Sequence, residues 1–213
     1  MKSNSKKVVV IGSGGRLGRS LMDSLTRDHE VTGVDRKALD LSSPGAIESA
    51  LAPLDYDELI LSGALTAVDY CETHRDEAFA VNAAGPGLIA EISASKGAHV
   101  TFISTDMVFD GMKSGLYVES DEAVPANVYG ESKLEGERRV LNASPKNLVA
   151  RVSWVFGPAR PAFPEWIIGR ACKEEDLTLP DDKICCPTYT EDLTQWLRAL
   201  TVRASPTNEL PAA

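Results

Sequence analysis

A glycine-rich loop near the start of the chain constrains the fold more than any other feature. The β-branched run Val8–Ile11 leads directly into the loop Gly12–Gly18, and a helical pattern follows to about Arg27. Small residues between a strand and a helix allow a tight turn and let the backbone approach a pyrophosphate closely. The helix N-terminus then offers free N–H groups and a favourable dipole. The loop therefore predicts a dinucleotide-binding site.

The end of the second expected strand bears on which dinucleotide binds. Asp35 ends the strand over residues 30–34, about 20 residues after the glycine loop. A carboxylate there accepts a hydrogen bond from a ribose 2′-hydroxyl and repels a 2′-phosphate, which favours NAD. Arg36 follows it and Arg16 lies in the loop, and either guanidinium could pair with a 2′-phosphate. The sequence thus favours NAD and leaves NADP open.

Short β-branched runs alternate with longer helical stretches along the chain. Strands are expected at residues 8–11, 30–34, 58–61, 98–104, 148–152 and near 183–185. Helices are expected at residues 16–27, 44–51, 76–96 with a kink at residues 85–87, 127–141, 164–173 and 191–200. This alternation predicts an α/β fold, a Rossmann-type doubly wound parallel sheet with helices on both faces. We expect residues 1–157 to form the NAD(P)-binding domain, residues 158–213 a short substrate-binding region, and residues 205–213 a disordered tail.

Composition narrows the range of partners. The formal net charge of −9 argues against binding to nucleic acid or to anionic membranes, which needs clustered Lys and Arg. No apolar run approaches the ~20 residues of a membrane span. The apolar run near the start of the chain is too short for a signal peptide. The four cysteines form no CxxC pair, and the adjacent Cys185 and Cys186 fit small residues at a strand end. We expect a cytoplasmic protein without a metal; the sequence leaves its oligomeric state open, a homo-oligomer included.

A tyrosine and a lysine lie four residues apart in the expected helix over residues 127–141. Tyr129 and Lys133 then share one helix face. A nearby positive charge stabilises a phenolate, so Tyr129 becomes a usable acid or base, and Lys133 could also bind a cofactor ribose. Ser104, Thr105 and Asp106 close the fourth expected strand at the sheet edge, where their hydroxyls can hydrogen-bond a substrate carbonyl. A glycine loop, a hydroxyl at the end of the fourth strand and the Tyr129–Lys133 pair thus occur in the order that an acid–base site beside a bound cofactor requires.

Five segments in this order resemble the extended short-chain dehydrogenase/reductases, and within them the dTDP-4-dehydrorhamnose reductase branch. The matching segments lie at residues 66–69, 102–111, 127–137, 151–157 and 187–193. The resemblance implies hydride transfer from a nicotinamide to the C4 ketone of a dTDP-6-deoxyhexulose, a nucleotide sugar. It implies a catalytic triad of Thr105, Tyr129 and Lys133, with Tyr129 as the proton donor.

The resemblance also distributes the binding roles. It implies cofactor contacts from the glycine loop, the end of the second strand, the residues after the third strand and the catalytic pair: Gly12, Gly15, Arg16, Leu17, Gly18, Asp35, Arg36, Asp40, Leu41, Ala64, Leu65, Thr66, Tyr129 and Lys133. It implies sugar-nucleotide contacts from Thr105, Asp106 and Trp154.

The chain departs from the family pattern at three places. Residues 61–66 read LSGALT where members usually read NAAAHT, Met107 replaces a usual Tyr, and the family continues beyond the segment at residues 187–193. We therefore expect the chain alone to bind dTDP-sugars weakly. Two alternatives stay open. One is a non-catalytic NAD(P)-binding module that resembles the regulatory subunit of methionine adenosyltransferase, and the other is a sugar-nucleotide epimerase or dehydratase.

Overall fold

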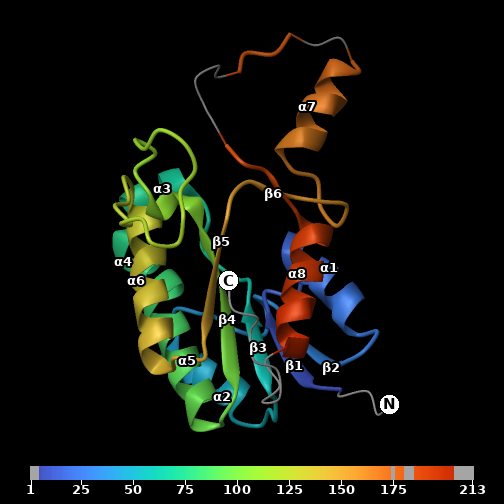
Figure 1. Ribbon diagram of the computed structural model, residues 1–213, viewed down its shortest axis with the longest axis vertical. Helices are drawn as coiled ribbons and strands as arrows, with labels where there is room; N and C mark the ends of the chain where they lie inside the picture. The colour runs from blue at the N-terminus through green and yellow to red at the C-terminus, as the bar shows by residue number, and fades with distance from the viewer. Residues whose placement is uncertain (1–4, 174–175, 180–184, 204–213) are drawn as a thin grey trace.

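The computed structural model describes residues 5–173, 176–179 and 185–203. Five parallel strands form the central sheet in the order β2-β1-β3-β4-β5 (Figure 1). They are β1 (Lys7–Ile11), β2 (Glu30–Val34), β3 (Glu58–Leu61), β4 (His99–Thr105) and β5 (Leu148–Val152). The strand order reverses between β1 and β3, and a doubly wound sheet opens a crevice at the carboxyl ends of its strands at that point. The predicted Rossmann-type fold is confirmed.

Side chains of β1 alternate between two apolar layers. Val8 and Val10 face α1 (Arg16–Leu25) and α8 (Thr190–Arg203), and all of these contribute to one buried cluster. Val9 and Ile11 face α2 (Pro44–Leu51), α5 (Gly85–Ser95) and α6 (Val128–Ala143) on the opposite side. In Figure 1 these two groups of helices flank the sheet. A strand buried on both faces explains why residues 8–11 are apolar without alternation.

The helix expected over residues 76–96 is built from three consecutive pieces. They are α4 (Arg75–Phe79), the π-helical turn η1 (Ala80–Ala84) and α5 (Gly85–Ser95). The irregular turn lies directly before the Gly85-Pro86-Gly87 segment that predicted a kink, and π turns are a common cause of kinks. Two further short elements were not predicted: α3 (Val68–Thr73) and the 3₁₀ turn η2 (Asp106–Val108).

The C-terminal part contributes a second, small sheet and two helices. The strands β6 (Val155–Phe156) and β7 (Thr188–Tyr189) pair in parallel, and neither was predicted. The helix α7 (Phe163–Ala171) matches its prediction, buries no residue, and stands beyond the upper end of the main sheet in Figure 1. The strand predicted near residues 183–185 falls largely outside the described residues, as does the predicted disorder of residues 205–213. The domain division at residue 157 stays a prediction.

Two wider properties concern only the residues that the structure describes. None of their helices combines the length and the apolar character that crossing a bilayer needs. No group of three or more His, Cys, Asp or Glu side chains among them is placed to hold a metal ion.

Candidate active site

The glycine loop is packed so tightly that two of its positions exclude a side chain. Gly12 has a φ of +86°, and a Cβ there would lie 2.6 Å from the amide nitrogen of Gly63, just after β3. A Cβ on Gly18 would lie 2.1 Å from the carbonyl oxygen of Gly12. The glycines therefore bring β1, α1 and the residues after β3 into direct backbone contact. Because of that close approach, backbone atoms rather than side chains form the surface at the carboxyl end of β1.

The N-terminus of α1 opens toward this surface. Its N-cap is Gly15, and no side chain caps the helix, so the first amide groups lack acceptors within the helix. The guanidinium of Arg16 has other partners, because it donates to the carbonyl oxygens of Val155 (3.2 Å), Arg160 (3.1 Å) and Pro161 (2.8 Å). The uncapped N–H groups and this backbone surface fit a pyrophosphate, whereas the Arg16 side chain ties the loop to residues 155–161.

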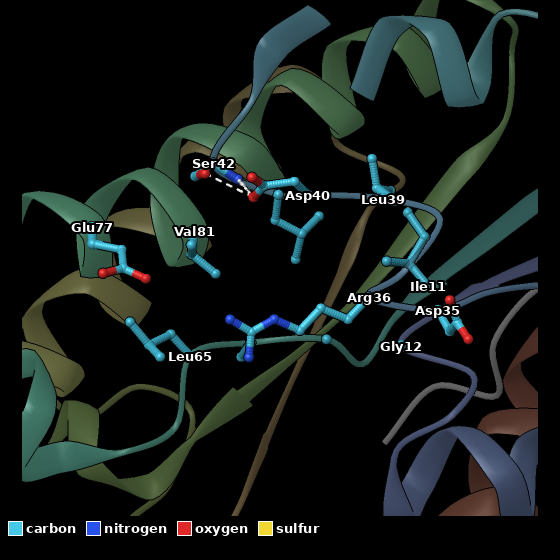
Figure 2. A pocket seen from close by; sticks show the side chains of 13 residues that line it. Ile11, Gly12, Asp35, Arg36, Leu39, Asp40, Ser42, Leu65, Glu77 and Val81 are labelled. Atoms are coloured by element: carbon cyan, nitrogen blue, oxygen red, sulfur yellow. Dashed lines mark hydrogen bonds between the residues drawn. The ribbon is translucent and has the colours of Figure 1, made fainter. Parts of the chain in front are cut away.

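A cavity of about 320 Å³ lies beside the loop, between the end of β2 and the residues after β3 (Figure 2). It is lined by Ile11, Gly12, Asp35, Arg36, Leu39, Asp40, Leu41, Ser42, Gly63, Ala64, Leu65, Glu77 and Val81. The predicted cofactor contacts Asp35, Arg36, Asp40 and Leu41 thus lie together. This mixed lining of apolar side chains and polar or charged groups suits an adenine ring and its ribose.

The side chains of the two charged residues at the end of β2, Asp35 and Arg36, point in different directions. Asp35 Oδ1 accepts hydrogen bonds from the amides of Lys37 (2.9 Å) and Ala38 (3.1 Å), which fixes the carboxylate on its own turn. The Arg36 side chain extends into the cavity toward Leu65 in Figure 2. The cavity therefore offers both an acceptor that suits a 2′-hydroxyl and a cation that suits a 2′-phosphate.

A second cavity of about 540 Å³ continues the first, and they share Gly12, Asp35, Arg36, Gly63 and Ala64. Its lining joins the glycine loop to the predicted catalytic pair: Gly12, Gly14, Gly15, Arg16, Leu17, Asp35, Arg36, Lys37, Ser62, Gly63, Ala64, Thr66, Ile103, Ser104, Tyr129, Lys133, Val152, Val155 and Arg160. One cleft thus contains the predicted cofactor residues and the predicted proton donor. Gly18, Thr105, Asp106 and Trp154 complete the predicted set but line neither cavity.

The predicted catalytic residues come from two neighbouring elements. Asn127 caps α6 by accepting a hydrogen bond from the Gly130 amide at 2.7 Å, which sets the start of the helix that carries Tyr129 and Lys133. Thr105 ends β4, and its hydroxyl donates to Asp106 Oδ1 at 3.2 Å. Asp106 Oδ2 in turn accepts from Ser153 Oγ at 2.5 Å.

Burial sets the protonation of Tyr129 and Lys133. It raises the pKa of Tyr129 to about 12, against a smaller lowering by the Thr105 hydroxyl. It also lowers the pKa of Lys133 to about 7, and the charge of Glu137 opposes that fall. Lys133 Nζ donates to the Ile103 carbonyl at 2.8 Å and lies 3.8 Å from the centre of the Phe102 ring. Desolvation therefore dominates the pKa of Tyr129, and Lys133 is not among the groups that shift it, contrary to the expectation that Lys133 lowers that pKa.

Trp154, the predicted substrate contact after β5, has a strained backbone. Its φ is 42°, a region that non-glycine residues rarely adopt. Its ring meets Phe163 edge-on, with ring centres 4.7 Å apart. Trp154 lies where the chain turns between β5 and β6. Such outliers are frequent at functional sites.

Sequence reasoning missed a buried amide that fixes the cleft wall. Asn82, in the π-helical turn, accepts from the Leu65 amide at 2.9 Å and donates to the Leu65 carbonyl and to Ser132 Oγ, both at 3.0 Å. Ser132 Oγ donates to the Tyr129 carbonyl at 2.8 Å. The chain thus links the residues after β3 to the catalytic helix. A lone Asn ahead of Gly85-Pro86-Gly87 was the only sequence signal.

Comparison with protein families gives a match over most of the chain. The profile of the RmlD substrate binding domain matches residues 6–211. A dTDP-4-dehydrorhamnose reductase of Aggregatibacter actinomycetemcomitans is 36% identical over 189 residues, which cover 88% of this chain and 64% of that protein. This chain therefore spans about two thirds of the length of such relatives.

Solved structures of similar fold also match most of this chain. A dTDP-4-dehydrorhamnose reductase from Bacillus anthracis, in complex with NADP, superposes with a TM-score of 0.89 at 30% identity, over 94% of this chain and 72% of that one. WbmG of Bordetella bronchiseptica, in complex with NAD and UDP, superposes with a TM-score of 0.84 at 18% identity, over 96% and 71%. The second likeness is one of fold alone.

Proposed function

The chain belongs to the RmlD substrate binding domain family, and from this premise we propose that it is an NAD(P)-dependent reductase of a nucleotide sugar. The substrate class that fits the resemblance is a dTDP-6-deoxyhexulose with a ketone at C4. One observation carries the proposal: Tyr129 and Lys133 line the same 540 Å³ cleft as the glycine loop. A hydride donor held by the loop and a proton donor would then meet at one carbonyl.

The chain's own groups fit a dinucleotide. The uncapped N-terminus of α1 and the backbone surface at Gly12 would hold the pyrophosphate. The cavity around Leu41 and Leu65 would hold the adenosine, and Lys133 would reach the second ribose. When bound, a reduced nicotinamide supplies the hydride that the carbonyl carbon accepts.

Tyr129 would deliver the proton that completes the reduction. Its raised pKa keeps the phenol protonated throughout the neutral range, which suits a donor. The proton would pass from Tyr129 Oη to the carbonyl oxygen, while the Thr105 hydroxyl holds that oxygen in place. Lys133, when protonated, would stabilise the phenolate that remains. Ketone, hydride and proton together give the alcohol.

The choice between the two cofactors rests on Asp35 and Arg36. We propose a modest preference for NAD, because Asp35 at the end of β2 would bind a 2′-hydroxyl and repel a 2′-phosphate. Arg36 favours NADP, since its guanidinium lies inside the adenosine cavity. The two residues act in opposite directions, so substituting each in turn separates their contributions.

A direct assay tests the reductase. Purified protein is mixed with NADH or NADPH and a dTDP-4-keto-6-deoxyhexulose, with simple ketones in parallel, and the loss of reduced cofactor is followed by absorbance. We expect oxidation of the cofactor with the sugar nucleotide, and almost none in Tyr129→Phe. Mass measurement in the same buffer reports the oligomeric state, since a second subunit could complete the substrate wall.

Two results would contradict the reductase. Clear cofactor binding without turnover of any carbonyl would favour the binding-module alternative. Conversion of the sugar nucleotide without net consumption of reduced cofactor would favour an epimerase or dehydratase.

A further inference from the structure

A buried ionic cluster lies directly behind the catalytic pair. Glu137, on α6, is only 3% exposed. Its Oε1 accepts from Ser104 Oγ at 2.5 Å and from Arg151 Nε at 3.0 Å, and its Oε2 accepts from Arg151 Nη2 at 2.6 Å. Ser104 and Arg151 face each other across the β4–β5 pair. One carboxylate therefore joins the catalytic helix to two adjacent strands near their carboxyl ends.

Glu137 also shares a helix face with the catalytic residues. Tyr129, Lys133 and Glu137 follow one another at spacings of four residues along α6. Lys133 is 1% exposed, and its ammonium donates to the neutral Ile103 carbonyl and lies over the Phe102 ring. A buried ammonium needs compensating negative charge, and Glu137 is the carboxylate whose charge acts on it.

We propose that Glu137 is a positioning residue for catalysis, which clamps α6 to β4 and β5 and supplies the counter-charge for the buried ammonium of Lys133. The catalytic part of this inference rests on the proposed reductase function. The charge relation between Glu137 and Lys133 is a property of the folded chain and can be measured without turnover.

The same residue sits between two cations, and this makes its role testable. Arg151 pairs with Glu137 through two nitrogens, its positive charge offsets part of the carboxylate's field at Lys133, and the pKa of Arg151 is raised chiefly by this hydrogen bonding. Removing Glu137's charge leaves Lys133 with a nearby guanidinium and no counter-charge. Removing Arg151's charge instead leaves the full carboxylate to Lys133. The two substitutions must therefore shift the pKa of Lys133 in opposite directions.

Other ionisable groups pack near the pair and act on Tyr129 rather than on Lys133. They are Asp106, which follows β4, and Cys71 on α3 (Val68–Thr73), and both raise the pKa of Tyr129. The turn η1 presents the uncharged Asn82, which donates to Ser132 Oγ. At the start of α6, Glu72 of α3 accepts from the Val128 amide and Arg75 of α4 pairs with Glu131. The pKa of Lys133 therefore reports the charge of Glu137, and the charge of Arg151 through its pairing with Glu137.

A lysine titration tests the charge relation directly. Protein labelled with ¹³C at lysine Cε is titrated by NMR, and Lys133→Met assigns the Lys133 signal. We expect a Lys133 midpoint near the pKa of about 7 that burial and Glu137 set together. Glu137→Gln should lower that midpoint by about one pH unit, and Arg151→Gln should raise it. Glu137→Asp keeps the charge and should restore most of the wild-type value.

The matched control lies on the same helix. Glu135 is a half-buried carboxylate that pairs with Arg139 at 2.8 Å and lines neither cavity, so Glu135→Gln removes one charge from α6 outside the cleft. It should leave the Lys133 midpoint unchanged. A fall in thermal stability shared by Glu137→Gln and Arg151→Gln would report the clamp, whereas the opposite midpoint shifts report the counter-charge.

Turnover gives the second readout. If the Lys133 midpoint falls from about 7 to about 6, the protonated fraction at pH 7 drops roughly five-fold, and kcat should fall by about that factor and recover at lower pH. Unchanged midpoints in both Glu137→Gln and Arg151→Gln would overturn the proposal. If Glu137→Gln does not fold, the sign of the Arg151→Gln shift decides. Absence of turnover in wild type would count against the reductase alone, because the midpoints are measured independently.

Discussion

Replacing Gly18 by alanine should damage the nucleotide cleft at a predictable cost. The added Cβ would lie 2.1 Å from the Gly12 carbonyl oxygen and 2.8 Å from the Gly12 carbonyl carbon and the Ser13 Cα, all of them backbone atoms. Ordinary contact begins near 3.4 Å, so α1 and the loop must move apart by more than an ångström. That movement also lifts Leu17 and Leu21 from the apolar layer that they form with β1.

The expected loss of stability follows from overpacking. Inserting a methyl group into a tightly packed region costs about 1–3 kcal/mol, and rigid backbone on the other side places Gly18→Ala at the upper end. For a chain of this size, about 3 kcal/mol corresponds to a fall of roughly 6–12 °C in Tm. The displaced amides of α1 should also weaken cofactor binding at least ten-fold, which equals about 1.4 kcal/mol.

Thermal unfolding and a fluorescence titration with NADPH measure the two effects. Gly169→Ala in α7 is the matched control, because its Cβ would meet nothing within 4 Å. Alanine is favoured over glycine in a helix by about 1 kcal/mol, so this variant should be as stable as wild type or slightly more stable. A Gly18→Ala protein with the wild-type Tm and wild-type cofactor affinity would refute the reasoning.

Three further predictions concern the cleft. Asp35→Ala should weaken NADH more than NADPH, and Arg36→Ala should do the reverse; equal losses of both cofactors in both variants, by direct titration, would show that neither residue selects. Tyr129→Phe should lower kcat by about 10²–10⁴-fold with cofactor affinity nearly unchanged, and a change in affinity alone would exclude its role as proton donor. Burial lowers the pKa of Lys133 to about 7, so between pH 7 and pH 10.5 the unfolded chain binds more protons, and the free energy of unfolding should rise with pH there. Denaturant titrations at pH 7 and pH 9 should show that rise in wild type and a smaller one in Lys133→Met.

Most helices and strands of the central sheet could be predicted from the sequence, because interactions between residues close together in the chain determine where they begin and end. The run at residues 8–11, the glycine loop and the Asn127 cap each have a physical reason that acts within a few residues, and the structure has a strand, a tight turn and a capped helix at these places. The π-helical turn at residues 80–84 was not predictable, because it depends on Asn82 bonding to Leu65, 17 residues away in the chain. Two-residue strands such as β6 and β7 carry no periodicity at all.

In the candidate site, too, contacts between residues far apart in the sequence could not be predicted. Sequence spacing placed Tyr129 and Lys133 on one helix face, and the structure brings both into the cleft of the glycine loop. It could not show that the Arg16 side chain is occupied by carbonyl groups near residue 160, since that contact spans more than a hundred residues. Nor could it show the Glu137 cluster, whose strand partners Ser104 and Arg151 meet only when β4 and β5 pair. The roles of the predicted site residues stay predictions.

The packing of α8 against α1 has a consequence for the order of folding. Leu193 and Leu197 of α8 complete the apolar layer that Val8, Leu17 and Leu21 begin. Within the described part of the chain, the opposite layer draws on residues no later than Val149. During synthesis, we therefore expect the face with α2, α5 and α6 to close first, while the face beneath the glycine loop waits for a helix about 170 residues downstream. Contacts of such long sequence separation form slowly, and a nascent chain would expose that apolar surface to chaperones until α8 emerges from the ribosome.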